Sequence, residues 1–151
     1  MNKEDKARIS AETVLGLIQD LYEVNLFLDG SILGKDLTRD QKCLLVKEFK
    51  YDGTDLDSTQ EALREYAESM SPSVQVRSSW EAPGSELEPY EYTVLISWGG
   101  PSVRIRGTLN RYNEPADALL EYQDWPTPWV WEEYNRNTDE LIWFVSQFYF
   151  G

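Results

Sequence analysis

The chain has 151 residues, 41% of them hydrophobic, and its 14 basic and 27 acidic side chains give a net charge of −13. This length predicts one domain, residues 1–151, with a single hydrophobic core. No apolar run reaches the roughly 18 residues of a membrane span, and the polar start lacks the apolar centre of a signal peptide, so we expect a cytoplasmic protein. The absence of histidine excludes histidine-based catalytic triads, histidine general bases and ordinary zinc sites.

The acidic excess lies in the last hundred residues. Residues 1–51 hold 9 acidic and 8 basic side chains, whereas residues 52–151 hold 18 acidic side chains and 6 basic ones, all of them arginine. A field of this sign repels nucleic acid and anionic membranes, and it attracts basic surfaces, including surfaces that normally hold nucleic acid. Solubility alone is the alternative explanation of the charge.

The first part of the chain, residues 10–71, predicts helices after a flexible start at residues 1–9. Ser10 is suited to be an N-cap, and the apolar residues after it recur at helical spacing up to Leu28. The sequence "TRDQ", which begins at Thr38, is a capping box and opens a second predicted helix.

A third predicted helix carries a row of glutamates. The sequence "STQE", which begins at Ser58, is another capping box, and the helix that it opens stops before Pro72. Glu61, Glu65 and Glu68 fall on neighbouring turns of this helix. We therefore expect their carboxylates to share one exposed face.

Residues 73–125 predict a sheet of four antiparallel strands. The first strand, "SVQVRSSW", alternates up to Trp80, with Val74 and Val76 on the same face, and an acidic loop follows. The run "YEYTVLISWGGPSVRIRGTL" alternates on both sides of a Gly-Gly turn and predicts a β-hairpin, and "ADALLEYQDW" predicts the fourth strand. The residues expected on the buried face of the hairpin are Tyr90, Tyr92, Val94, Ile96, Trp98, Val103, Ile105 and Leu109.

The chain ends in a predicted helix, residues 138–150, with Thr138 as its N-cap. The predicted fold class is α+β, with N-terminal helices, a four-stranded antiparallel meander sheet and a C-terminal helix packed on the sheet. The residues of the last helix that are expected to cover the sheet are Leu141, Ile142, Val145, Phe148 and Tyr149.

The opposite face of the predicted hairpin is charged. Arg104 and Arg106 lie on it, and the neighbouring strands can add Arg77 and Glu121. One interpretation is a solvent-facing sheet stabilised by ion pairs across the strands. The other is a partner site in which the arginines bind a carboxylate or a phosphate.

Several carboxylates lie close together in the sequence. Asp52, Asp55 and Asp57 stand in "YDGTDLDST", where the glycine precedes the aspartates that should surround it in a calcium loop, so a turn leading into a helix cap explains them better. Glu121 and Asp124 lie beside three tryptophans, as a small glycosidase would require. Residues three apart on a strand point to opposite faces, which argues against that reaction.

Other catalytic chemistry has little support in the sequence. Cys43, the single cysteine, has apolar neighbours and is expected to be a buried inert thiol. The sequence "SILGKDLT" lacks the first glycine and the spacing of a phosphate-binding loop. We expect no catalytic residues, no metal and no cofactor.

The stretch "QDWPTPWVWEEY" holds three of the six tryptophans. Prolines bias the residues before them away from helix, so this stretch is expected to form a rigid corner after the last strand. Trp125 ends that strand and is expected to fold back as a latch. Trp131, which Glu132 and Glu133 follow, is expected to be an exposed anchor for a partner.

The run from Tyr92 to Tyr134, with "ISWGGPSVRIRGTL" and "NEPADALLEYQDWPTPW", resembles a family of small acidic proteins carried by bacteriophages and other mobile elements. The resemblance covers a little under a third of the chain and implies no reaction. It implies a genomic setting in which small acidic proteins often block host defence machinery, anti-CRISPR proteins among them.

Charge and resemblance together predict a non-enzymatic inhibitor of a host nucleic-acid-binding defence complex, of the anti-CRISPR or anti-restriction type, in the bacterial cytoplasm. Its expected partner is a basic protein surface, with no direct binding of nucleic acid or membrane. An immunity protein that neutralises a basic toxin is the alternative, and a small glycosidase or sugar-binding module is a further one. The expected partner-binding residues are Asp52, Asp55, Asp57, Glu61, Glu65, Glu68, Glu86, Glu88, Trp131, Glu132 and Glu133.

Overall fold

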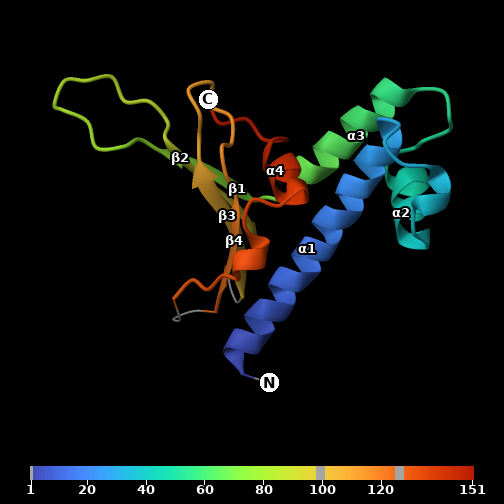
Figure 1. Cartoon of the computed structure of the whole chain (residues 1–151), viewed down its shortest axis with the longest axis horizontal. Helices are drawn as coiled ribbons and strands as arrows, with labels where there is room; N and C mark the ends of the chain where they lie inside the picture. Colours follow the sequence, from blue (N-terminus) through green and yellow to red (C-terminus); the bar gives the residue numbers. More distant parts are fainter. Residues whose placement is uncertain (1, 98–100, 125–127) are drawn as a thin grey trace.

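The computed structural model describes residues 2–97, 101–124 and 128–151, and these form four helices and one sheet (Figure 1). The four strands are antiparallel and pair in chain order, which confirms the predicted α+β class and the meander. The helices are α1 (Lys3–Leu28), α2 (Arg39–Cys43), α3 (Leu56–Ser69) and α4 (Asp139–Val145). The strands are β1 (Ser73–Arg77), β2 (Glu91–Ser97), β3 (Ser102–Thr108) and β4 (Leu119–Gln123).

Helix α1 is the main cover of the sheet and packs against β3, β4 and α4. Ile18, Leu21 and Val24 recur every three residues and are fully buried, so they form the apolar stripe of the helix. The helices α1 and α4 lie on one face of the sheet, and no helix among the described residues covers the other face (Figure 1). The sheet therefore has one dry face and one face open to solvent.

The start of α1 differs from the prediction. The helix begins at Lys3, where the side chain of Asn2 accepts a hydrogen bond from the Asp5 amide at 2.8 Å, so Ser10 is not its N-cap. Ala7 and Ala11 are buried and continue the apolar stripe toward the N-terminus. Alanine contributes little to a hydropathy pattern, which is why the sequence did not indicate these two turns.

The second helical segment begins as the sequence indicates. Thr38 and Gln41 form the capping box of α2, because each side chain bonds the backbone amide of the other, at 2.9 and 3.2 Å. The helix then widens into a π-helical turn, η2 (Leu44–Glu48). That change of pitch explains why the apolar residues of this segment are clustered instead of periodic.

The predicted cap of α3 is wrong by three residues. Asp55 is the N-cap, and its side chain accepts a hydrogen bond from the Ser58 amide at 3.0 Å. Ser58 is therefore the third residue of the helix, and the expected capping box does not form. Asp55 and Ser58 both suit a cap, and the loop geometry before the helix selects the earlier residue.

The sheet confirms most of the hairpin's expected inner face. Tyr92, Val94, Val103, Ile105 and Leu109 are buried, and Ile96 is half-buried. Tyr90, which directly precedes β2, is exposed, and this corrects the prediction. Trp98 and the Gly-Gly turn lie outside the described residues.

The first strand is shorter and less buried than expected. β1 ends at Arg77, so Trp80 is not part of it and is fully exposed in the loop that follows. Val74 and Val76 are also exposed, because β1 is the edge strand farthest from β4, the strand on which α1 packs. The sheet therefore has one open edge at β1.

The other edge, at β4, is covered by the chain that returns after it. Tyr122 and Val130 exchange two backbone hydrogen bonds of 2.9 Å each, and the Asn137 amide donates to the Ala118 carbonyl at 2.7 Å. Another strand is thereby prevented from pairing there.

The last helix has the predicted N-cap and a shorter length. The Leu141 amide donates to the Thr138 hydroxyl at 3.3 Å, and the helix ends at Val145. The chain then turns so that the Phe150 ring packs on the Tyr92 ring, with centroids 4.8 Å apart. Tyr149 is exposed, contrary to the expectation that it covers the sheet.

None of the helices among residues 2–97, 101–124 and 128–151 has the length and apolar character needed to cross a membrane.

The close approach of Gly107 to Asp117 gives a test of this packing. A methyl group at position 107 would overlap the Asp117 carbonyl oxygen, which also accepts the Tyr92 hydroxyl at 2.6 Å. We expect Gly107→Ala to lower the free energy of unfolding by about 1–3 kcal/mol, as overpacking does. Urea unfolding followed by circular dichroism measures the change.

The same substitution at Gly16 is the matched control. Apart from its chain neighbours and the nearby backbone of α1, no atom of the described residues lies within 4 Å of the position of its new methyl group. Gly16→Ala is therefore expected to stabilise the protein by about 0.5–1 kcal/mol. Equal effects of the two substitutions would contradict the contact between Gly107 and Asp117.

Candidate functional site

The predicted acidic face of α3 forms as expected. Asp57, Glu61, Glu65 and Glu68 are all exposed, and their spacing of three and four residues places them on one stripe of the helix. Arg64 pairs with Glu61 at the margin of this stripe, and that hydrogen bond raises the pKa of the Arg64 guanidinium. The stripe carries four carboxylates beside one cation.

Asp52 and Asp55 precede this helix and serve the turn before it. Asp52 accepts hydrogen bonds from the amide and the hydroxyl of Thr54, which lower the pKa of its carboxyl group. Asp55 is the N-cap of α3. Both side chains are exposed, so they extend the acidic surface of α3.

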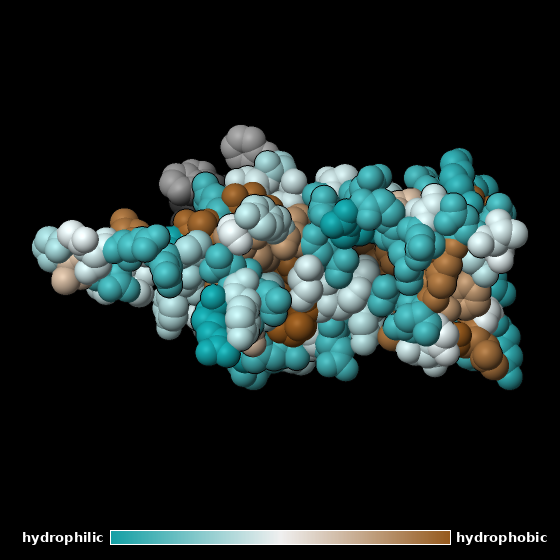
Figure 2. All heavy atoms as spheres, turned by 90° about the horizontal axis from the view of Figure 1, so that it is seen from above, coloured by the Kyte–Doolittle hydropathy of each residue, from teal (hydrophilic) through white to brown (hydrophobic). Residues whose placement is uncertain are grey.

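The other predicted acidic residues lie elsewhere. Glu86 and Glu88 are exposed on the long loop between β1 and β2, which projects from the end of the molecule opposite α3 (Figure 1). Figure 2 shows the same projection from above, on a face that is mostly hydrophilic. The structure therefore does not bring these two glutamates together with the acidic stripe of α3.

The segment from Trp131 to Glu133 lies beside β4 and forms a third location. Glu132 accepts a hydrogen bond from the Tyr122 hydroxyl at 2.6 Å, so it is tied to the sheet. Glu133 is exposed and pairs with Arg136 at 3.0 Å. Trp131 is 45% exposed, in agreement with its expected position at the surface.

The remaining tryptophans of the stretch have different environments. Trp129 is half-buried, and the Arg104 guanidinium stacks over its ring at 3.9 Å from the centroid. Trp125, the expected latch, lies outside the described residues.

The solvent-facing side of the sheet carries an organised charge cluster. Glu121 is 2% exposed, and one of its carboxylate oxygens accepts from Arg104 Nε at 2.9 Å and from Arg106 Nε at 2.7 Å. Arg77 on β1 pairs with Glu91 on β2, which raises the pKa of the Arg77 guanidinium. The predicted cross-strand ion pairs therefore form. Because Glu121 is buried under two arginines, it is poorly placed for the carboxylate role of a glycosidase.

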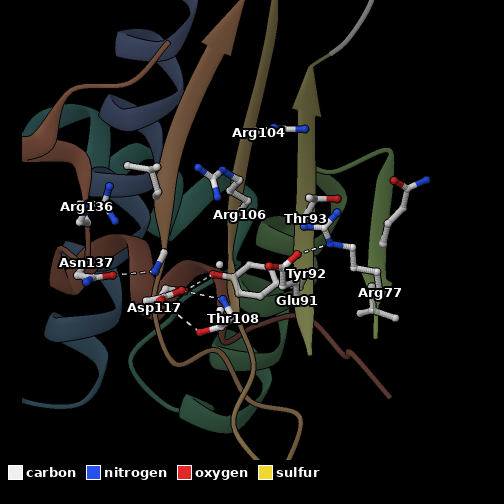
Figure 3. Close-up of a pocket in the computed structure, with 15 residues that line it drawn as sticks. Arg77, Glu91, Tyr92, Thr93, Arg104, Arg106, Thr108, Asp117, Arg136 and Asn137 are labelled. Carbon is white, nitrogen blue, oxygen red and sulfur yellow. Dashed lines mark hydrogen bonds and ion pairs between the residues drawn. The ribbon is translucent and has the colours of Figure 1, made fainter. Parts of the chain in front are cut away.

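A cavity of about 360 Å³ opens over this cluster (Figure 3). Arg77, Arg104, Arg106 and Arg136 all line it, together with the acids Glu91 and Asp117. The pairing register places Gln75, Thr93, Arg106 and Leu119 in one row across the four strands, and Arg136 bridges to Leu119 beyond them. Figure 3 shows Arg136, Arg106 and Arg77 in succession across the sheet.

The floor of the cavity is held by groups that the sequence did not indicate. The Asp117 carboxylate accepts from the Thr108 amide at 2.7 Å and from its hydroxyl at 3.2 Å. Burial, with a smaller contribution from Asp117, raises the pKa of the Tyr92 phenol. Asn137 accepts from the Ala118 amide at 2.8 Å and adopts a positive φ of 55°. Asp117 lies in the predicted fourth strand and Asn137 directly precedes the predicted last helix, so no sequence pattern marked them as cavity residues.

Cys43 and metal binding are the remaining candidates from the sequence. Cys43, the last residue of α2, is exposed, whereas the sequence predicted a buried thiol. Across the described segments of the chain, no three histidine, cysteine, aspartate or glutamate side chains are grouped so as to hold a metal ion.

Glu121 is expected to contribute to stability out of proportion to its single charge. Glu121→Gln keeps the shape of the side chain but replaces an acceptor for two guanidinium groups by a neutral amide. We expect a loss of about 1–3 kcal/mol in the free energy of unfolding, the cost of weakening a buried charged hydrogen bond. The measurement is urea unfolding at neutral pH.

Glu91→Gln is the matched control, because the Arg77 side chain with which Glu91 pairs is 77% exposed. Exposed ion pairs contribute about 0–1 kcal/mol, so this substitution is expected to have a small effect. If both variants lost the same stability, Glu121 would not anchor the face.

Comparisons with protein-family models, with curated proteins and with solved structures find no match.

Proposed function

We propose that the protein is a non-enzymatic inhibitor that binds the basic surface of a nucleic-acid-binding host defence complex. The acidic stripe of α3 is the contact surface, extended by Asp52 and Asp55. The observation that carries the proposal is the exposure of Asp57, Glu61, Glu65 and Glu68 on one face of a single helix.

The geometry of the stripe supports the replacement of phosphates by carboxylates. From Asp57 to Glu68 the stripe runs about 16 Å along the helix axis, at 1.5 Å per residue. A basic surface that holds nucleic acid presents lysine and arginine side chains to a line of negative charges. The helix offers such a line on a rigid support.

The rest of the chain adds to the attraction. The net charge of −13 supplies a long-range field that steers a basic partner toward the protein and repels free nucleic acid. The resemblance of Tyr92–Tyr134 to small acidic proteins of bacteriophages and mobile elements supports the host defence setting. Trp131 and Glu133 provide a separate, smaller exposed contact beside β4.

Charge reversal on α3 tests the proposal. The triple variant Glu61→Lys, Glu65→Lys, Glu68→Lys is expected to fold normally, because exposed pairs stabilise a helix by only about 0.2–0.5 kcal/mol. It should no longer capture the complex from host lysate or prevent that complex from binding nucleic acid. Circular dichroism checks the fold, and a gel-shift competition measures the inhibition.

A matched variant separates the α3 face from net charge. Glu81→Lys, Glu86→Lys, Glu88→Lys makes the same charge change on the exposed loop between β1 and β2. It is expected to retain most of the inhibition. Equal loss in both variants would mean that total charge, and not the α3 face, determines binding. A partner limited to one toxin encoded beside the gene would support an immunity protein instead.

Salt gives an independent prediction. If carboxylates replace phosphates, the association rate and the affinity should both fall as the salt concentration rises, because the Debye length is only about 8 Å at physiological ionic strength. Surface plasmon resonance from 50 to 500 mM sodium chloride measures both. An affinity that does not change with salt would point to an apolar contact, for which Trp131 is the candidate.

A further inference from the structure

We propose that the arginine-lined cavity on the open face of the sheet binds a small ligand that carries phosphate groups. The proposal concerns a different surface from the α3 stripe and does not depend on the function proposed above. Three features of the cavity support such a ligand: its concentration of arginine, the use of Nε in the ion pair of each arginine, and its size.

Arginine is concentrated at this cavity. Residues 52–151 contain six arginines and have a net charge of −12, yet four of the six line one cavity. When Glu121 and Glu133 are counted with the lining acids, the cluster is neutral within a strongly acidic segment. An anion in this cavity is therefore repelled less than an anion elsewhere on the acidic segment.

All four arginines use the same guanidinium nitrogen, Nε, in their ion pairs. Arg77, Arg104, Arg106 and Arg136 each bond a carboxylate through Nε. The hydrogen bonds that Arg77, Arg104 and Arg106 donate to these carboxylates also come from Nε. Each group is thus oriented from one side while the fork of its two terminal nitrogens stays available for a bidentate contact.

The acids in the lining are already engaged. Asp117 accepts two hydrogen bonds from Thr108, and Glu91 pairs with Arg77. Gln75 and Thr93, in the same cross-strand row as Arg106, add an amide and a hydroxyl as further donors. The set of free donors suits a ligand whose charged groups only accept hydrogen bonds, as phosphate oxygens do.

The size of the cavity and the negative electrostatic field of the protein both favour a small ligand over a nucleic acid. A volume of about 360 Å³ lies within the usual range of small-molecule pockets, about 300–1,000 Å³. A nucleic acid would extend past the cavity into the field of an acidic protein. Guanidinium forks spaced across the sheet match phosphate groups at more than one position better than a single planar carboxylate (Figure 3).

Isothermal titration with inorganic pyrophosphate tests the proposal on the full chain. We expect one site per chain, with binding weakened about tenfold by Arg106→Lys, which keeps the charge but loses the fork. Arg77→Gln should also weaken binding, and it should leave folding unchanged because that side chain is 77% exposed. Urea unfolding confirms that each variant is folded.

Arg111→Ala is the matched control, because it removes one positive charge from an exposed residue that does not line the cavity. It is expected to leave pyrophosphate binding unchanged. An equal loss in Arg111→Ala and Arg77→Gln, or no binding at millimolar pyrophosphate, would overturn the proposal. Citrate or a single-stranded oligonucleotide that bound as tightly as pyrophosphate through the same arginines would also overturn it, because the site would then not select a small phosphorylated ligand.

Discussion

The rest of the structure depends on one constraint, which is that the described helices cover only one face of the sheet. Ile18, Leu21 and Val24 of α1 bury the inner face together with α4. The outer face must then satisfy its own polar groups in contact with water. It does so with arginines and carboxylates that pair across strands. Glu121 is buried beneath two of these arginines, although none of the described helices covers this face.

Acidic and basic side chains occupy different parts of the molecule. Carboxylates collect on α3 and on the loop between β1 and β2, which lie at opposite ends of the molecule (Figure 1). Arginines collect between them, on the sheet. Under the two proposals made above, the α3 stripe would contact a basic partner and the arginine-lined cavity would bind a small anion. The two surfaces involve different residues, so substitutions in one need not disturb the other.

Local signals account for what could be predicted. The capping residues Thr38 and Thr138 and the alternation around Tyr92 and Ile105 act within a few residues, and the structure confirms them. The start of α1 was missed because alanines carry little apolar signal. The α3 cap was misplaced because Asp55 and Ser58 compete for one role.

Only part of the arginine-lined cavity could be predicted from the sequence, because its residues come from two kinds of position. Arg104 and Arg106 share one strand, so their common face could be derived from a period of two. Arg136 reaches the same cavity through a single bridge to Leu119 after a long connection, and no local pattern encodes that bridge. The separation of Glu86 from Glu61 depends on the direction of a loop, which charge patterning does not determine.

The long-range packing of α1 also has a consequence for the order in which the chain folds. The helix contacts α2 and α3, which follow it closely in the chain, but β3 and β4, on which it also packs, begin about seventy residues or more after its end. Its contacts with the sheet therefore close a long loop, and the entropy of closing that loop opposes folding until the non-local contacts form. The side of the apolar stripe that faces the sheet is thus expected to become buried late in folding, after β3 and β4 have paired.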